Sequence, residues 1–156
     1  MPSHSESRFV PYTAQFMYGI VADVERYPEF VPWCASLRIE SREPSPTGET
    51  LIAETVVGFK SFRERYTSKV TLDPAACKVD VVQTQGVFRH LENHWHFVPE
   101  GEVCRIEFSI SFEFKSRVLA LIAEAALGQV MARMTRAFEA RAKALSRKNA
   151  LLKKPV

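Results

Sequence analysis

The 156-residue sequence contains only three cysteines, few glycines and no long uninterrupted apolar run. The cysteines, Cys34, Cys77 and Cys104, are odd in number and far apart, which argues against a disulfide framework and against a paired-cysteine zinc site. No run approaches the roughly 18 consecutive apolar residues of a membrane span, so we expect none. The first residues have neither an apolar signal core nor an arginine-rich presequence, and we therefore expect a cytoplasmic location.

The sequence also lacks the motifs of common catalytic sites. It has no glycine-rich phosphate loop, nucleophile elbow or zinc-protease motif. His90, His94 and His96 lie at alternate positions, and a His-x-His pair can bind a metal. Because Trp95 and Phe97 point to the opposite face of the same strand pattern, the histidines are placed toward solvent. We expect no metal site and no required cofactor.

What is present is typical of one soluble domain. The chain is 46% hydrophobic and 25% charged, which is ordinary for a globular protein of this length. Its net charge of +3 is uneven, because the residues from Arg133 onward include eight basic and one acidic residue, a net +7, which leaves −4 for the rest. This end suits an anionic membrane surface or ribosomal RNA, unless it is simply a solvated helix face. The basic residues concerned are Arg133, Arg136, Arg141, Lys143, Arg147 and Lys148.

The periodicity of apolar residues predicts an α+β domain. Thr13 is a candidate N-cap for a first helix, and apolar residues at alternate positions predict strands that end with a twelve-residue strand at 103–114. Helical spacing then predicts one long helix over 115–146. The expected strands lie at 8–10, 37–40, 51–57, 62–72, 77–84, 91–97 and 103–114. The natural arrangement is a curved antiparallel sheet of six to seven strands against the long helix, with two short helices after the first strand.

One short segment carries an unusual amount of apolar and aromatic surface. Residues Val21–Cys34 read Val-Ala-Asp-Val-Glu-Arg-Tyr-Pro-Glu-Phe-Val-Pro-Trp-Cys. The two prolines push the residues before them toward extended geometry, which limits any helix between them to about one turn. We call this segment, Val21–Cys34, the plug, because it is suited to cover a core or to close a cavity.

Two motifs give the chain a family resemblance. The plug is similar to the N-terminal motif of the coenzyme Q-binding protein family, within the START-like, or polyketide cyclase, superfamily. Residues 86–97, Gly-Val-Phe-Arg-His-Leu-Glu-Asn-His-Trp-His-Phe, resemble that family's second motif, Gly-Pro-Phe-x-x-Leu-x-Asn-x-Trp-x-Phe. Val87 replaces the proline that many members have. The resemblance covers about residues 5–145 and implies the helix-grip fold.

The resemblance also implies a function. It suggests a non-catalytic protein that binds ubiquinone or a related polyprenyl lipid and supports respiratory electron transport or quinone biosynthesis, with transient contact to a membrane. The same family has a branch described as ribosome-association toxins, which would act through the basic surface. A cyclase-type enzyme is a further alternative, for which Glu64 and Tyr66 are the only visible acid–base candidates. These alternatives stay open at this point.

The residues expected to line the ligand site lie on the inward faces of strands, in the plug and on the long helix. Periodicity does not distinguish a filled core from a cavity, but the resemblance favours a cavity. Glu64 and Asn93 are polar at inward positions, where they either hydrogen-bond a quinone carbonyl with Tyr66 or satisfy backbone groups. The full set is Phe30, Trp33, Phe62, Glu64, Tyr66, Phe88, Asn93, Trp95, Phe108, Phe112, Leu127, Val130, Met131 and Met134.

The expected boundaries are a polar N-terminal tail at 1–7, a single lipid-binding domain at 8–146 and a basic C-terminal tail at 147–156. Phe30, Val31 and Trp33 are expected to form an entrance lid near the far end of the long helix.

Overall fold

A single seven-stranded antiparallel sheet dominates the computed structural model, which describes residues 3–59 and 61–153. The strand order is β1-β7-β6-β5-β4-β3-β2, so each strand from β2 to β6 pairs with the next one along the chain, and β1 pairs with β7 at the far edge. The strands are β1 (Ser3–Val10), β2 (Cys34–Ser45), β3 (Gly48–Phe59), β4 (Phe62–Asp73), β5 (Lys78–Gly86), β6 (Phe88–Glu100) and β7 (Val103–Phe114).

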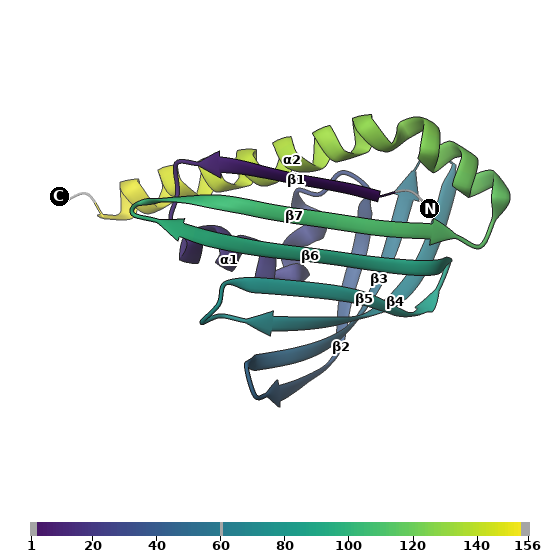
Figure 1. The fold of residues 1–156 in the computed structure, drawn as a ribbon, viewed down its shortest axis with the longest axis horizontal. Coiled ribbons are helices and arrows are strands. Elements are labelled where there is room, and N and C mark those ends of the chain that lie inside the picture. Colours follow the sequence, from purple (N-terminus) through teal and green to yellow (C-terminus); the bar gives the residue numbers. More distant parts are fainter. Residues whose placement is uncertain (1–2, 60, 154–156) are drawn as a thin grey trace.

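Three helices complete the fold: α1 (Ala14–Ala22), the short 3₁₀ helix η1 (Val24–Glu29) and α2 (Arg117–Lys153). The strands β2–β4 run steeply across the direction of β1, β7 and β6, so the sheet is strongly bent, and α2 runs along it (Figure 1). The predicted α+β helix-grip fold is thereby confirmed, with the two short helices between β1 and β2 as expected.

The alternation in β7 explains how the sheet acquires an apolar face. Cys104, Ile106 and Phe108 are each at most 5% exposed, while Arg105 and Glu107 point to the other face and pair with each other. A strand that buries one face in this way packs its apolar side chains against the rest of the core.

The structure corrects the expected N-terminal boundary of the domain. Residues 3–7, predicted to be a polar tail, belong to β1, which pairs with β7 from Ser3 opposite Ser111 onward. Its inward side chains are polar because they contact α2: Glu6 accepts a hydrogen bond from the Thr135 hydroxyl at 3.0 Å, and Arg8 pairs with Glu139. Backbone pairing and these polar contacts extend the predicted strand at 8–10 back to Ser3.

The plug contains the 3₁₀ helix η1, which spans Val24–Glu29 and includes Pro28. The expected extended geometry before this proline is therefore wrong, because the helix runs through the proline and does not lie between the two prolines. Thr13 caps α1 through its Oγ1, which accepts from the Phe16 amide at 3.2 Å. Within η1, the Tyr27 hydroxyl donates to the Val21 carbonyl, which ties the plug back to the end of α1. Burial of that phenol raises the pKa of Tyr27. Tyr27 and Phe30 both contact Phe138 of α2, with ring centroids 5.5 and 5.1 Å from its own.

The helix α2 is longer than its apolar pattern indicates. It continues through the region predicted as a basic tail to Lys153, and residues 154–156 lie outside the described residues. By length and composition alone, the stretch Arg117–Lys148 is also long and apolar enough to cross a membrane. The sequence did not predict this possible span, because Glu124 and Gln129 interrupt the run of consecutive apolar residues. In this structure the stretch lies along the sheet (Figure 1).

The interior contains two separate groups of buried residues. The larger one joins α1, the plug and the C-terminal half of α2 to the sheet, and includes Met17, Trp95 and Phe138. The smaller one contains Phe88, Leu91 and Phe112 at the start of β6 and the end of β7. The two groups do not merge into one continuous core, because a cavity lies between the sheet and α2.

Candidate functional site

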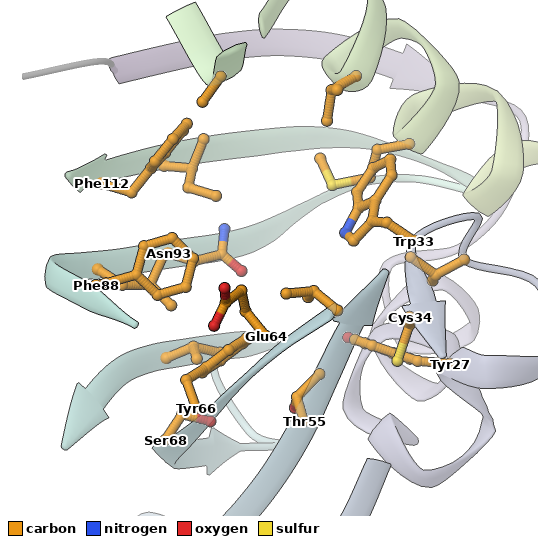
Figure 2. A pocket seen from close by; sticks show the side chains of 18 of the residues that line it. Tyr27, Trp33, Cys34, Thr55, Glu64, Tyr66, Ser68, Phe88, Asn93 and Phe112 are labelled. Atoms are coloured by element: carbon orange, nitrogen blue, oxygen red, sulfur yellow. The ribbon is translucent and has the colours of Figure 1, made fainter. Parts of the chain in front are cut away.

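A cavity of about 260 Å³ lies between the concave face of the sheet and α2 (Figure 2). Its wall is mostly apolar and comes from the plug, from strands β2–β7 and from α2 between Leu119 and Phe138. The volume lies just below the roughly 300–1,000 Å³ that is usual for small-molecule pockets. Such a wall favours an apolar or amphipathic ligand.

Strand β4 supplies the most varied part of the wall. Phe62, Glu64, Tyr66 and Ser68 alternate with outward residues and all line the cavity, as the period of two predicts. At the end of β5, Gly86 lies directly against Tyr66 of β4. A Cβ at position 86 would lie 2.5 Å from the Tyr66 Cβ. The glycine of the second motif is therefore required by a close approach of two strands.

Asn93 is held by the sheet rather than left free for a ligand. Its Nδ2 donates to the Ser109 carbonyl at 3.0 Å, and its Oδ1 accepts from the Trp95 indole nitrogen at 3.0 Å. This arrangement fixes the Trp95 ring against Phe138, with centroids 5.1 Å apart. Of the two roles expected for Asn93, the structure shows the one that satisfies neighbouring groups.

Glu64 differs from Asn93 in having no such partners. Its carboxylate points into the cavity, near the Asn93 amide (Figure 2). Within residues 3–59 and 61–153, no hydrogen bond or ion pair joins the Glu64 carboxylate to another residue.

Tyr66 is the second polar group of interest. Burial raises the pKa of its phenol to about 12, although a hydrogen bond from Thr55 lowers it in part. The hydroxyl therefore stays protonated at neutral pH. A phenol hydroxyl can both donate and accept hydrogen bonds, so Tyr66 can donate one to a ligand.

Most of the predicted ligand-binding residues line the cavity, but two do not. Phe30 lies on the outer side of the plug, where it packs on Phe138 and under the Arg141 guanidinium, 5.1 Å from the ring centroid. Phe108 points to the correct face of β7 but packs between Trp95 and His4. The residues that do line it are Trp33, Phe62, Glu64, Tyr66, Phe88, Asn93, Trp95, Phe112, Leu127, Val130, Met131 and Met134.

Several lining residues were not singled out from the sequence. Thr55 and Ser68 are polar residues that are only 5% and 3% exposed, and both line the cavity. Ser68 shares the alternation of Tyr66, which is the signal that places it. Cys34 also lines the cavity, and burial raises the pKa of its thiol to about 11. It is a wall residue of the cavity.

The basic residues of α2 are not equivalent. Arg141 pairs with Glu29 at 3.1 Å and stacks on Phe30, so it fastens the plug to the helix. In contrast, Arg133, Arg136 and Lys143 are exposed. Arg147 and Lys148 are exposed as well. The proposed contact surface therefore excludes Arg141.

Comparison with known proteins identifies the family. Residues 10–139 match the family model described as polyketide cyclase / dehydrase and lipid transport. The chain is 37% identical over 144 residues to a coenzyme Q-binding protein, COQ10 homolog B, of Xenopus laevis, covering 89% of this chain and 57% of that protein. It is 31% identical over 146 residues to the ribosome association toxin RatA of Rickettsia prowazekii, covering 92% and 97%.

A solved structure agrees with these matches. The 18 kDa protein CC1736 of Caulobacter crescentus is 36% identical to this chain and superposes with a TM-score of 0.79, covering 94% of this chain and 99% of that one. The family resemblance noted in the plug and in the second motif is confirmed. The chain belongs to the polyketide cyclase / dehydrase and lipid transport family.

Proposed function

We propose that this protein binds ubiquinone or a related polyprenyl lipid in the cavity and delivers it without making or breaking a bond. The observation that carries the proposal is the apolar cavity of about 260 Å³ with a few polar groups on one wall. Each buried CH₂ contributes about 0.8 kcal/mol before ordering costs. A head group and the first isoprene units are therefore sufficient for micromolar binding.

The cavity volume also limits how much of the ligand it encloses. At about 260 Å³ it has the size of a site for a small molecule, not for a whole polyprenyl chain. The remaining tail would leave the cavity and need another apolar environment. This fits a carrier that works at the cytoplasmic surface of a membrane in support of respiratory electron transport or quinone biosynthesis.

The polar groups of the cavity favour binding over catalysis. A cyclase-type mechanism would need an acid and a base that converge on the substrate. Tyr66, with its pKa raised to about 12, is a poor base at neutral pH, and Asn93 is occupied by Ser109 and Trp95. Glu64 would then be the only base, with the weakly acidic Tyr66 as its acid partner.

Organic extraction of the purified protein, followed by mass spectrometry, tests the proposal. We expect a ubiquinone or another prenyl lipid in the extract, directly or after incubation with quinone-containing vesicles. An extract without any prenyl lipid after that incubation would refute it.

Ribosome association is a second candidate, favoured by the match over 97% of a relative named as a ribosome association toxin and by the exposed basic residues of α2. Overexpression separates the two candidates. Translational arrest with altered ribosome profiles favours the ribosome, whereas normal profiles with a recovered prenyl lipid favour the carrier.

A further inference from the structure

The unpaired Glu64 carboxylate indicates which form of ligand the cavity prefers. An ionised carboxylate offers only hydrogen-bond acceptors. A quinone ring likewise presents only acceptors, which are its carbonyl and ether oxygens. Two acceptors do not pair. A hydroquinone or phenol carries hydroxyl groups that donate, and these match Glu64 directly.

Tyr66 completes the match from the same strand. Its protonated hydroxyl has a proton to donate and an oxygen that can also accept. A ring hydroxyl can donate to Glu64, while a ring oxygen accepts from Tyr66. Asn93 is held by Ser109 and Trp95, and its second amide N–H is a donor that a ring oxygen of either redox form can accept.

We propose that the cavity selects the hydroxyl-bearing form of its ligand, a hydroquinone or a prenylated phenol, through a hydrogen bond to Glu64. This inference rests on the proposed function. A hydrogen bond to a charged group is worth enough for about a tenfold preference or more. For a two-electron couple, a tenfold preference raises the midpoint potential of the bound ligand by about 30 mV.

Anaerobic titration with a short-tailed ubiquinone and its hydroquinone tests the preference. Both tryptophans of the chain, Trp33 and Trp95, line the cavity, so their fluorescence reports binding, with calorimetry as a check. We expect the hydroquinone to bind about tenfold more tightly to the wild type. Glu64→Gln should abolish or reverse this ratio, because an amide can donate to a quinone carbonyl.

Glu113→Gln is the matched control, since Glu113 follows the cavity residue Phe112 and points to the opposite face of β7. It should keep the wild-type ratio. Equal affinity of the two redox forms for the wild type, or an unchanged ratio in Glu64→Gln, would overturn the inference. Failure of both forms to bind would instead contradict the proposed function.

A second inference rests on a different observation, the outward face of α2. Exposed residues that are spaced by three, four, seven or eleven positions, about one, two or three helical turns, lie along one stripe. We call these residues the outer stripe: Val118, Leu121, Ala125, Arg136, Lys143 and Arg147. The cavity-lining residues Leu127, Met131 and Met134 lie on the other side of the helix.

The chemistry of the outer stripe changes along its length. Its first half is apolar, with Val118 and Leu121 59% and 68% exposed. Only 17% of the apolar 18-residue window of this helix is buried. Its second half is basic. In the described part of α2, Glu124 is the only exposed acidic side chain, so little opposes a positive potential.

We infer that the outer stripe docks on a bilayer containing anionic phospholipids. Apolar side chains enter the boundary between head groups and acyl chains, and basic ones contact the head groups. An RNA surface would match the basic half but would leave Val118 and Leu121 in water. Leu119 and Ile122, on the same turns, line the cavity, so docking would bring the cavity close to the lipid.

Vesicle flotation tests this surface, with phosphatidylcholine vesicles that contain or lack phosphatidylglycerol. We expect binding only to the anionic vesicles, with weakening at high salt. Leu121→Asp should reduce the affinity about tenfold, and the double substitution Arg136→Glu, Lys143→Glu should remove the salt dependence. Val82→Asp is the control, because Val82 is a 41% exposed apolar residue on β5, and it should bind as the wild type does.

Two results would overturn the inference. One is the absence of binding to anionic vesicles. This includes the case in which the protein sediments with ribosomal subunits instead and the charge-reversed variant no longer sediments with them. The other is vesicle binding by Leu121→Asp equal to that of the wild type.

Discussion

Replacing Ala126 with tryptophan is expected to abolish ligand binding and leave the fold intact. Ala126 lines the cavity on α2, and an indole at this position would occupy the volume that a head group or isoprene unit needs. Loss of four to six buried CH₂ groups costs about 3–5 kcal/mol, or at least about a hundredfold in affinity. Titration with a short-tailed quinone and its hydroquinone in detergent measures the effect.

The neighbouring residue provides the control. Ala125 is exposed on the outward side of the same turn, so Ala125→Trp should bind the ligand as the wild type does. Because the Ala126→Trp indole enters open volume rather than packed side chains, the free energy of unfolding should change by no more than about 1 kcal/mol. Wild-type affinity in Ala126→Trp would place the ligand outside the cavity.

The faces of the strands could be predicted from the sequence because the side-chain period of two is strict. Phe62, Glu64 and Tyr66 were placed on one face, and all three line the cavity. The same rule does not predict where along the bent sheet a side chain lies, or which residues it contacts. Phe108 therefore has the correct face and the wrong neighbours, since it lies against Trp95 and His4.

Other features depend on contacts that no periodicity encodes. The orientation of the plug is set by a 3₁₀ helix containing Pro28, whose spacing matches neither a strand nor an α-helix. Val31 consequently faces the cavity while Phe30 faces outward. Residues 3–7 of β1 were missed because the inward residue Glu6 is polar, and its partner is Thr135 on α2.

Phe138→Ala should cause the largest loss of stability among single substitutions at the interface of the plug and α2. Phe138 is only 5% exposed, and its ring centroid lies 5.1 to 5.5 Å from those of Tyr27, Phe30 and Trp95. Truncation of a buried phenylalanine costs about 3–5 kcal/mol, including contacts with aromatic neighbours worth about 0.5–1.5 kcal/mol each. Urea denaturation measures the free energy of unfolding.

Phe9→Ala removes the same side chain from a site that is 61% exposed and should cost less than about 0.5 kcal/mol. A loss below about 1 kcal/mol in Phe138→Ala would mean that the plug and α2 are stabilised independently. If the full loss is observed, the plug is held mainly by the C-terminal half of α2. Because Val31, Trp33 and Cys34 of the plug line the cavity, loosening this contact should also open one end of the site. A bound ligand should then dissociate faster from Phe138→Ala than from the wild type under conditions in which both proteins are folded.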